Sequence, residues 1–189
     1  MRPWECSRAC SHRKPPEQRF PHDVVDLEQT LPAAVAGRQL VRWSVRGDNF
    51  WNIVRGGRLR ADWAPILAQI GLSLSDIEFA VAGRADSRRD PPYIIGALRL
   101  GTLRDQALFG PWPSTLAMDA LNIDPNQGED WRKESLAGKD VLVGHRGMVH
   151  QDSHQRGLPV VFVSPTTIYT VVSDDLAWTT NALTQLPAG

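Results

Sequence analysis

Apolar residues alternate with polar or small residues in several stretches of this chain, and this alternation constrains the fold more than any other feature. It is clearest from Val41 to Val45 and from Ile77 to Val81. A period of two residues is that of a β-strand, whose side chains point alternately to the two faces of a sheet. Similar stretches bounded by turn residues predict further strands at Tyr93 to Leu100, Trp131 to Leu136, Val141 to His145, Val160 to Ser164 and Ile168 to Val172.

Two of these strands are expected to form a hairpin near the middle of the sheet. The segment from Tyr93 to Leu100 is apolar at almost every position, which favours a strand covered on both faces. It follows the strand at 77 to 81 after a turn-rich stretch, so the two should pair. Gly138 predicts a tight turn between two later strands, and Trp43 is expected on a buried strand face.

A different spacing, with apolar residues three or four positions apart, predicts helices. Their expected N-caps are short polar residues, because these accept hydrogen bonds from the unpaired first turn. The expected helices are Leu27 to Leu31 capped by Asp26, Trp63 to Ile70 capped by Asp62, two short helices within Leu103 to Asn122, and a terminal helix capped by Ser173 or Asp174 with Leu176, Thr180 and Leu183 on one stripe.

The order of these elements predicts an α+β fold with a mainly antiparallel sheet and helices packed on one face. The composition, 42% hydrophobic and 22% charged, is that of a packed globular protein. Residues 1–23 lack periodicity and are rich in Arg and Pro, so we expect a disordered basic tail there and a single α+β domain over 24–187.

One short motif occurs three times along the chain. Residues 34–38 read Ala-Val-Ala-Gly-Arg, residues 80–84 repeat them, and residues 135–139 read Ser-Leu-Ala-Gly-Lys. The spacings are unequal, whereas a repeat architecture has a constant period. Similar strand and turn chemistry at each place explains the motif, and the alternative is a fold made of two related β-α-β halves.

A set of positions resembles bacterial proteins of unknown activity from actinobacterial and chloroflexal genomes. The resemblance covers about residues 26 to 187 and rests on turn and strand motifs: Leu31-Pro32, Val35-Ala36-Gly37, Ala80-Val81-Ala82, Gly96-Ala97-Leu98-Arg99, Gly138-Lys139-Asp140-Val141, Asp174-Asp175 and Leu186-Pro187. It implies no activity. Many of these relatives are exported behind a leader, whereas this sequence begins without one, so location stays open between the cytoplasm and the cell envelope.

Charge and motif content argue against several functional classes. Twenty-one basic and twenty-one acidic residues give a net charge of zero, which does not favour nucleic acid as a partner. No apolar run reaches the length of a transmembrane segment. Phosphate loops, dinucleotide fingerprints, nucleophile elbows and metalloprotease helices are absent from the sequence, so we expect no cofactor and favour a protein without catalytic activity.

Two groups of residues are candidate sites. His145, His150, Asp152 and His154 fall within ten residues, and imidazole with carboxylate is a ligand set for zinc, nickel or copper. The other explanation is a solvent-facing hairpin loop.

Trp51 and Trp112 lie beside turn residues rather than on predicted core stripes, which is typical of partner-binding aromatics. The sequence therefore predicts a domain that binds a small ligand or a protein, at the cell envelope if exported. The alternative is a metal-binding protein or metal-dependent enzyme that uses the loop from His145 to His154.

Overall fold

The computed structural model describes residues 20–47, 49, 67–68, 71–83, 93–100, 132–144, 148–149 and 156–188. Its helices and strands, in chain order, are α1 (Val25–Gln29), β1 (Ala34–Val35), β2 (Arg38–Gln39), β3 (Val41–Arg46), the 3₁₀ helix η1 (Leu74–Asp76), β4 (Ile77–Gly83), β5 (Ile94–Leu100), β6 (Arg132–Leu136), β7 (Lys139–Val143), β8 (Met148–Val149), β9 (Arg156–Val163), β10 (Thr167–Ser173) and α5 (Leu176–Gln185).

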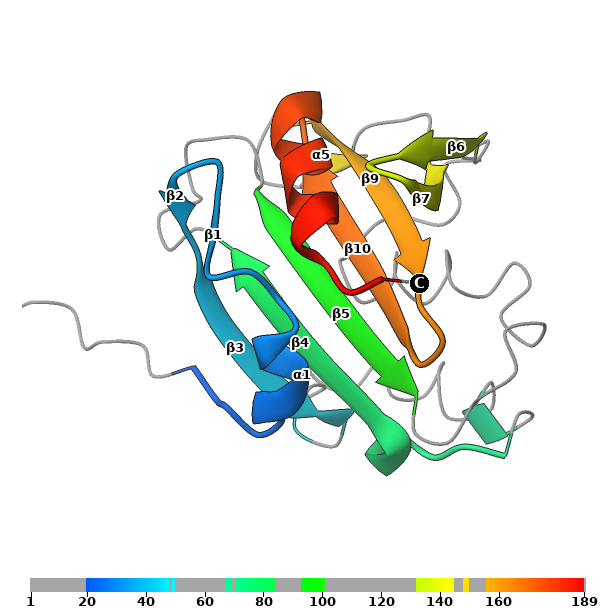
Figure 1. Ribbon diagram of the computed structural model, residues 1–189. Coiled ribbons are helices and arrows are strands. Elements are labelled where there is room, and N and C mark those ends of the chain that lie inside the picture. Colours follow the sequence, from blue (N-terminus) through cyan, green and yellow to red (C-terminus); the bar gives the residue numbers. More distant parts are fainter. Residues whose placement is uncertain are drawn as a thin grey trace, which may run out of the picture.

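Seven strands form one continuous sheet in the order β3-β4-β5-β10-β9-β7-β6 (Figure 1). Every neighbouring pair along this path is antiparallel. The short strand β8 pairs with β9 outside the path, and β1 and β2 form a separate two-stranded sheet. A mainly antiparallel sheet, as the sequence predicts, is confirmed.

The predicted hairpin at the centre of the sheet is also confirmed. β4 and β5 pair along their whole length, from Ile77 opposite Leu100 to Gly83 opposite Ile94. β5 lies between β4 and β10, so both of its edges are paired and most of its side chains are buried on both faces. A strand that is covered on both faces is apolar at most positions, which explains why Arg99 is the only charged residue of β5.

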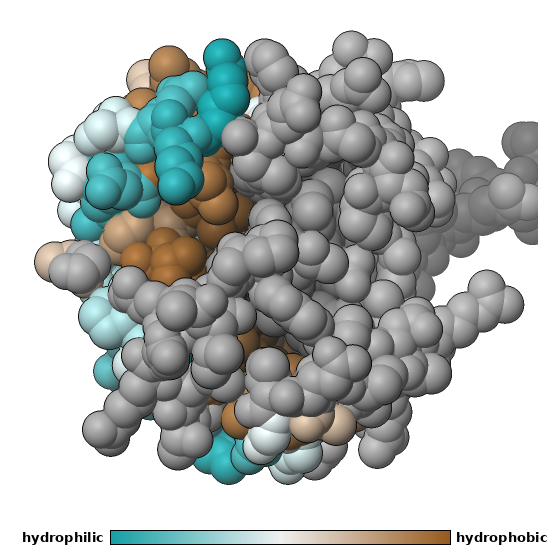
Figure 2. Space-filling model, turned by 90° about the vertical axis from the view of Figure 1, so that its right-hand side faces the viewer, coloured by the Kyte–Doolittle hydropathy of each residue, from teal (hydrophilic) through white to brown (hydrophobic). Residues whose placement is uncertain are grey.

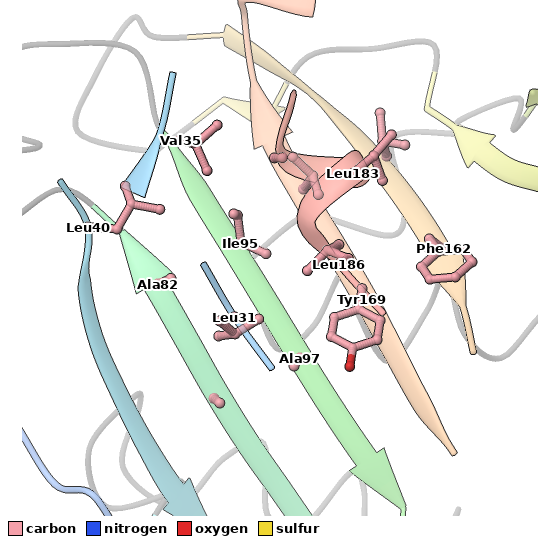
Figure 3. Close-up of a cluster of buried hydrophobic side chains, with 14 of the residues drawn as sticks. Leu31, Val35, Leu40, Ala82, Ile95, Ala97, Phe162, Tyr169, Leu183 and Leu186 are labelled. Carbon is pink, nitrogen blue, oxygen red and sulfur yellow. The ribbon is translucent and has the colours of Figure 1, made fainter. Parts of the chain in front are cut away.

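The sheet carries a separate buried cluster on each face. Cross-strand register places Phe162, Tyr169, Ala97, Ala80 and Ser44 in one row across the sheet, because directly opposite residues share a face. This row belongs to the larger cluster, which Figure 3 shows, together with side chains from α1, α5 and β1. The second cluster, on the other face, includes Val45, Leu67, Leu74, Ile77, Phe79, Leu98, Leu100, Val161 and Ile168.

Helix α1 begins two residues earlier than predicted, and Asp26 is not its N-cap. The residue that precedes the helix is Val24, whose backbone N–H donates to the Ser44 hydroxyl at 2.9 Å. Strand β3 therefore satisfies the backbone N–H of the N-cap residue itself, and no side chain caps this helix. Asp26 lies in the first turn, where its carboxylate pairs with Arg99 of β5.

The terminal helix α5 is confirmed, but its cap and its buried stripe differ from the prediction. Its N-cap is Asp175, which accepts from the Trp178 backbone N–H at 3.0 Å. Leu176 is 66% exposed, so its assignment to the buried stripe is wrong. The buried residues of the helix are Trp178, Thr179, Ala182 and Leu183, so Leu183 is the one predicted stripe residue among them.

Two copies of the repeated motif form the same tight turn. Ala36 and Gly37 have φ of 49° and 78°, and Ala137 and Gly138 have φ of 54° and 71°. Positive φ at both central residues defines the type I′ turn, whose twist matches that of a two-stranded hairpin. The predicted turn at Gly138 is confirmed. The third copy instead lies in strand β4, so similar local chemistry explains two of the three occurrences.

The edge strand β3 departs from the predicted pattern of one dry face. Val45 is buried, but Trp43 is only partly buried and Val41 is exposed, while Ser44 on the opposite face is fully buried. The cause is the segment before α1: the Ser44 backbone N–H donates to the carbonyl of Pro21, and the Ser44 carbonyl accepts from the Asp23 N–H. This segment pairs with the open edge of β3, and the Ser44 hydroxyl accepts from the Val24 N–H that follows it.

Several expectations concern residues outside the described ranges. They include residues 1–19 of the basic tail predicted over 1–23, most of the helix predicted over 63–70 and both short helices predicted over 103–122. The end of the predicted tail is described, and there Pro21 and Asp23 are hydrogen-bonded to Ser44. Whether all helices pack on one face, and whether the fold contains two related halves, therefore stay predictions. Within the described part of the chain, no helix is long and apolar enough to cross a membrane.

Candidate functional site

A groove of the described structure lies where two neighbouring strands separate. β7 pairs with β9 over only three positions, from Val141 opposite Phe162 to Val143 opposite Val160. Yet β7 begins two residues earlier, at Lys139, and β9 continues to Val163. The tip of the β6–β7 hairpin thus leaves the sheet while each strand keeps its other neighbour, β6 or β10.

A groove of about 970 Å³ opens at this separation. This β7–β9 groove is lined by Lys133, Glu134, Ser135, Gly138, Lys139, Asp140, Val141, Leu142, Val161, Phe162, Val163 and Ala188. Figure 2 views the molecule from the side of Figure 1 on which β6 and β7 lie, and there it shows hydrophobic surface beside hydrophilic residues. An apolar lining with a few charged groups is the usual composition of a ligand site.

The groove has charged groups without a charged partner. Glu134 is paired, since its carboxylate lies 3.7 Å from the Arg132 guanidinium. Among the described residues, Lys133, Lys139 and Asp140 have no ion pair. Two lysines and one aspartate are therefore unpaired, with Lys133 and Asp140 on one face of the hairpin and Lys139 on the other. The groove has a small excess of positive charge.

Lys139 occupies a defined position at the groove. Its Nζ lies 4.8 Å from the centre of the Phe162 ring and donates to the carbonyl of Pro187 at 3.0 Å. An ammonium group has three N–H donors, so this contact leaves two for a ligand. The aromatic ring and the carbonyl hold the ammonium group in place. Because the side chain is already ordered, it loses less conformational entropy when a ligand binds.

A second polar cluster, His22, Glu28 and Ser44, has the residue types of a hydrolase triad but not the geometry. His22 Nδ1 lies 2.8 Å from the Glu28 carboxylate, and the Ser44 hydroxyl donates to the same carboxylate oxygen at 3.1 Å. A nucleophilic serine must donate to the imidazole, whereas this hydroxyl binds the acid directly. Ser44 is also fully buried. The cluster attaches α1 to strand β3.

A third cluster joins α1 to the middle of the sheet. Arg99 donates to the carboxylates of Asp26 and Glu78, with 2.7 Å between Arg99 and Asp26. The hydrogen bond from Arg99 holds the pKa of Asp26 below its ordinary value, and the same bond raises the pKa of Arg99. All three charges are satisfied by one another, which is the arrangement of a structural ion pair rather than a reactive group.

The side chains predicted from sequence to bind a metal or a partner, those of His145, His150, Asp152, His154, Trp51 and Trp112, all lie outside the described residues. The structure does show that Met148 pairs with Gly157 and Val149 with Arg156, so residues 150–155 connect two paired strands. In the described ranges, no cluster of His, Cys, Asp or Glu could hold a metal ion. Both sites remain predictions.

Sequence reasoning missed the β7–β9 groove. The sequence predicts strands at 131–136, 141–145 and 160–164, but it does not predict that β7 begins at Lys139, and the end of a pairing register leaves no mark in local sequence. The available signal was indirect: a polar sequence, Arg-Lys-Glu-Ser, precedes the Ala-Gly turn in β6, where an interior strand would be apolar.

In comparisons with known proteins, no family, no curated protein and no solved structure matches this chain.

Proposed function

We propose that this chain is a non-catalytic binding domain whose ligand occupies the β7–β9 groove. The observation that carries the proposal is the early end of the β7–β9 pairing, which opens a groove lined by apolar side chains and unpaired charges. The clusters with catalytic residue types are used for packing: Ser44 and Glu28 connect an edge strand to α1, and Arg99 is neutralised by two carboxylates.

Ligand-observed NMR with a collection of small amphipathic acids and short peptides tests this function. Ser135→Trp places a large side chain at the groove from an exposed strand position. Gln39→Trp is the matched control, because Gln39 is also exposed and also lies close to an Ala-Gly turn. Gln39 lies two residues after Gly37, and Ser135 lies two residues before Ala137. We expect Ser135→Trp to abolish binding and Gln39→Trp to leave it unchanged. Equal binding by both variants, or no bound compound at all, contradicts the proposal.

We also propose that the domain acts at the cell envelope and that Trp51 and Trp112 contribute to partner binding. The first point is supported by the resemblance to bacterial proteins that are often exported, and the second by the position of each tryptophan beside turn residues. For the fold, we propose that the helices pack on one face of the sheet and that the chain contains two related β-α-β halves. The same Ala-Gly turn in hairpins β1–β2 and β6–β7 supports the two related halves.

A metal-binding protein, or a metal-dependent enzyme, is the second candidate. It is supported by the pairing of β8 with β9, which holds together the ends of the segment that carries His150, Asp152 and His154. Metal analysis of purified protein, before and after incubation with Zn²⁺, tests it. About one equivalent of zinc that is lost in a His150→Ala/His154→Ala variant favours this function, and no retained metal excludes a zinc site.

A further inference from the structure

We propose that the occupant of the β7–β9 groove is an extended peptide with acidic side chains, which pairs with the main chain where β7 and β9 separate. This inference rests on the binding function proposed above and specifies its ligand. It follows from three features of the groove: the kind of backbone in its walls, the distribution of its side chains over two faces, and its charge.

The walls of the groove are strands whose ladder stops. Lys139 and Asp140 pair with Leu136 and Ser135 of β6, but the pairing with β9 does not include them. On the other wall, Val163 pairs with Ile168 of β10 and not with β7. Strand backbone at the end of a ladder offers N–H and C=O groups in the spacing that another strand needs, which is how many domains bind extended peptides.

The side chains of the groove come from both faces of the sheet. Val141 and Phe162 are opposite one another on one face, and Leu142 and Val161 are opposite one another on the other face. An extended peptide directs alternate side chains to opposite sides. Val141, Phe162 and Val161 are almost fully buried, so the apolar side chains within reach are the partly buried Leu142 and Val163 on one face. Lys139 lies on the other face, so a peptide with alternating apolar and acidic side chains matches this division.

The charge of the groove favours an acidic peptide over a basic one. Lys133 and Lys139 have no ion pair within the described structure, and they outnumber the single unpaired carboxylate, Asp140. Lys139 is also held in position by the Phe162 ring and the Pro187 carbonyl. A carboxylate that reaches its remaining donors forms a charge-assisted hydrogen bond.

The proposal is tested by titrating the isotope-labelled full chain with capped heptapeptides in which Val alternates with Glu. Two control peptides isolate the contributions: one has Lys in place of Glu, and one has the Glu sequence with N-methylated backbone at alternate positions. Octanoate is a fourth probe, because it has a carboxylate and an apolar body but no peptide backbone. The readout is the chemical shift of the backbone amides of Lys139, Asp140 and Val163.

We expect the Val-Glu peptide to shift these three amides, and the Lys and N-methylated peptides to bind at least about tenfold more weakly. Lys139→Ala should weaken binding by about fivefold or more, as the loss of one charge-assisted hydrogen bond predicts. The matched variant is Arg38→Ala, since Arg38 also follows an Ala-Gly turn and also lies over an aromatic ring, that of Tyr93. It should bind normally.

The other outcomes separate the two proposals. If octanoate shifts the groove amides and the Val-Glu peptide does not, the groove binds small amphipathic acids; the peptide proposal is then wrong and the binding function stands. If the N-methylated peptide binds as well as the parent, backbone pairing is excluded. If none of the four probes shifts these amides, and the ligand screen described above also finds nothing, both proposals fail.

Discussion

The hairpin β1–β2 and the hairpin β6–β7 are built from nearly the same sequence and end in different environments. Each turns at Ala-Gly with positive φ at both residues, and each places a cation on an aromatic ring directly after the turn. Arg38 lies 4.3 Å from the centre of the Tyr93 ring, and Tyr93 packs edge-on against Trp178. Lys139 lies over Phe162, which stacks on Tyr169.

The difference lies in what surrounds each turn. β1 contributes the fully buried Val35 to the large core cluster, and it contacts the terminal helix α5. In β6, the equivalent residue is Leu136, which is only partly buried, and the tip of this hairpin leaves the sheet to border the β7–β9 groove. The comparison shows that local sequence determines the turn, whereas packing determines whether the turn closes a core or borders a groove.

The largest loss of stability is expected at the aromatic pair that contacts the first hairpin, Tyr93 and Trp178. Trp178 is 1% exposed, so Trp178→Ala should lower the free energy of unfolding by about 3–5 kcal/mol through lost burial and a cavity. Leu176→Ala, two residues earlier and largely exposed, should change it by about 0.5 kcal/mol or less. Urea denaturation monitored by circular dichroism measures both. Equal losses would contradict the burial of Trp178.

The residues before the two turns provide a direct test. Val35→Ala should cost about 2 kcal/mol, because Val35 is fully buried. Leu136→Ala removes a larger side chain but should cost about 1 kcal/mol or less, since that position is partly buried and can rehydrate. Denaturant midpoints measured side by side give the ranking. A larger loss at Leu136 would show that the second hairpin is as enclosed as the first.

The turns themselves should respond alike. Alanine in the left-handed region is strained, whereas asparagine adopts that conformation readily and Asn-Gly is the preferred type I′ sequence. Ala36→Asn and Ala137→Asn should each raise the free energy of unfolding by about 0.5 kcal/mol. The matched Ala→Val variants should destabilise. A stabilisation confined to one hairpin would mean that tertiary contacts, and not the turn, determine the local conformation.

The smallest expected effect is the change in stability at acid pH that comes from Asp26, which lies in neither hairpin. A carboxyl group whose pKa is lower in the folded chain contributes stability above its unfolded pKa and loses it as the pH falls through the folded value. The pKa of Asp26 is lowered mainly by its hydrogen bond from Arg99, so this contribution should be present above about pH 4 and lost below it. Because the Asp26 side chain is 70% exposed, the effect should be about 0.5 kcal/mol or less.

Thermal unfolding from pH 2 to pH 7 measures this contribution. Asp26→Asn should flatten the profile in the acid range and leave it unchanged in shape above pH 5. An unchanged acid limb would show that the bond between Arg99 and Asp26 does not contribute to stability.

The sequence by itself determined the local elements in the described part of the chain. Alternation predicted β3 and β4, because the period of two is a property of the strand alone, and a nearly continuous apolar run between turn residues predicted β5 and its hairpin with β4. The glycine at 138 predicted its turn, because only a few residues tolerate positive φ there.

Tertiary structure decided everything that depends on a distant partner. Ser44 donates to Glu28, and its hydroxyl accepts from the Val24 N–H, so the start of α1 is bonded to β3 and Asp26 lies in the first turn rather than at the N-cap. The pairing of β7 with β9 ends after three positions, and the sequence of neither strand predicts this end. Local propensities act over a few neighbouring residues, while a groove arises where segments far apart in sequence fail to meet, and only the packed chain defines that place.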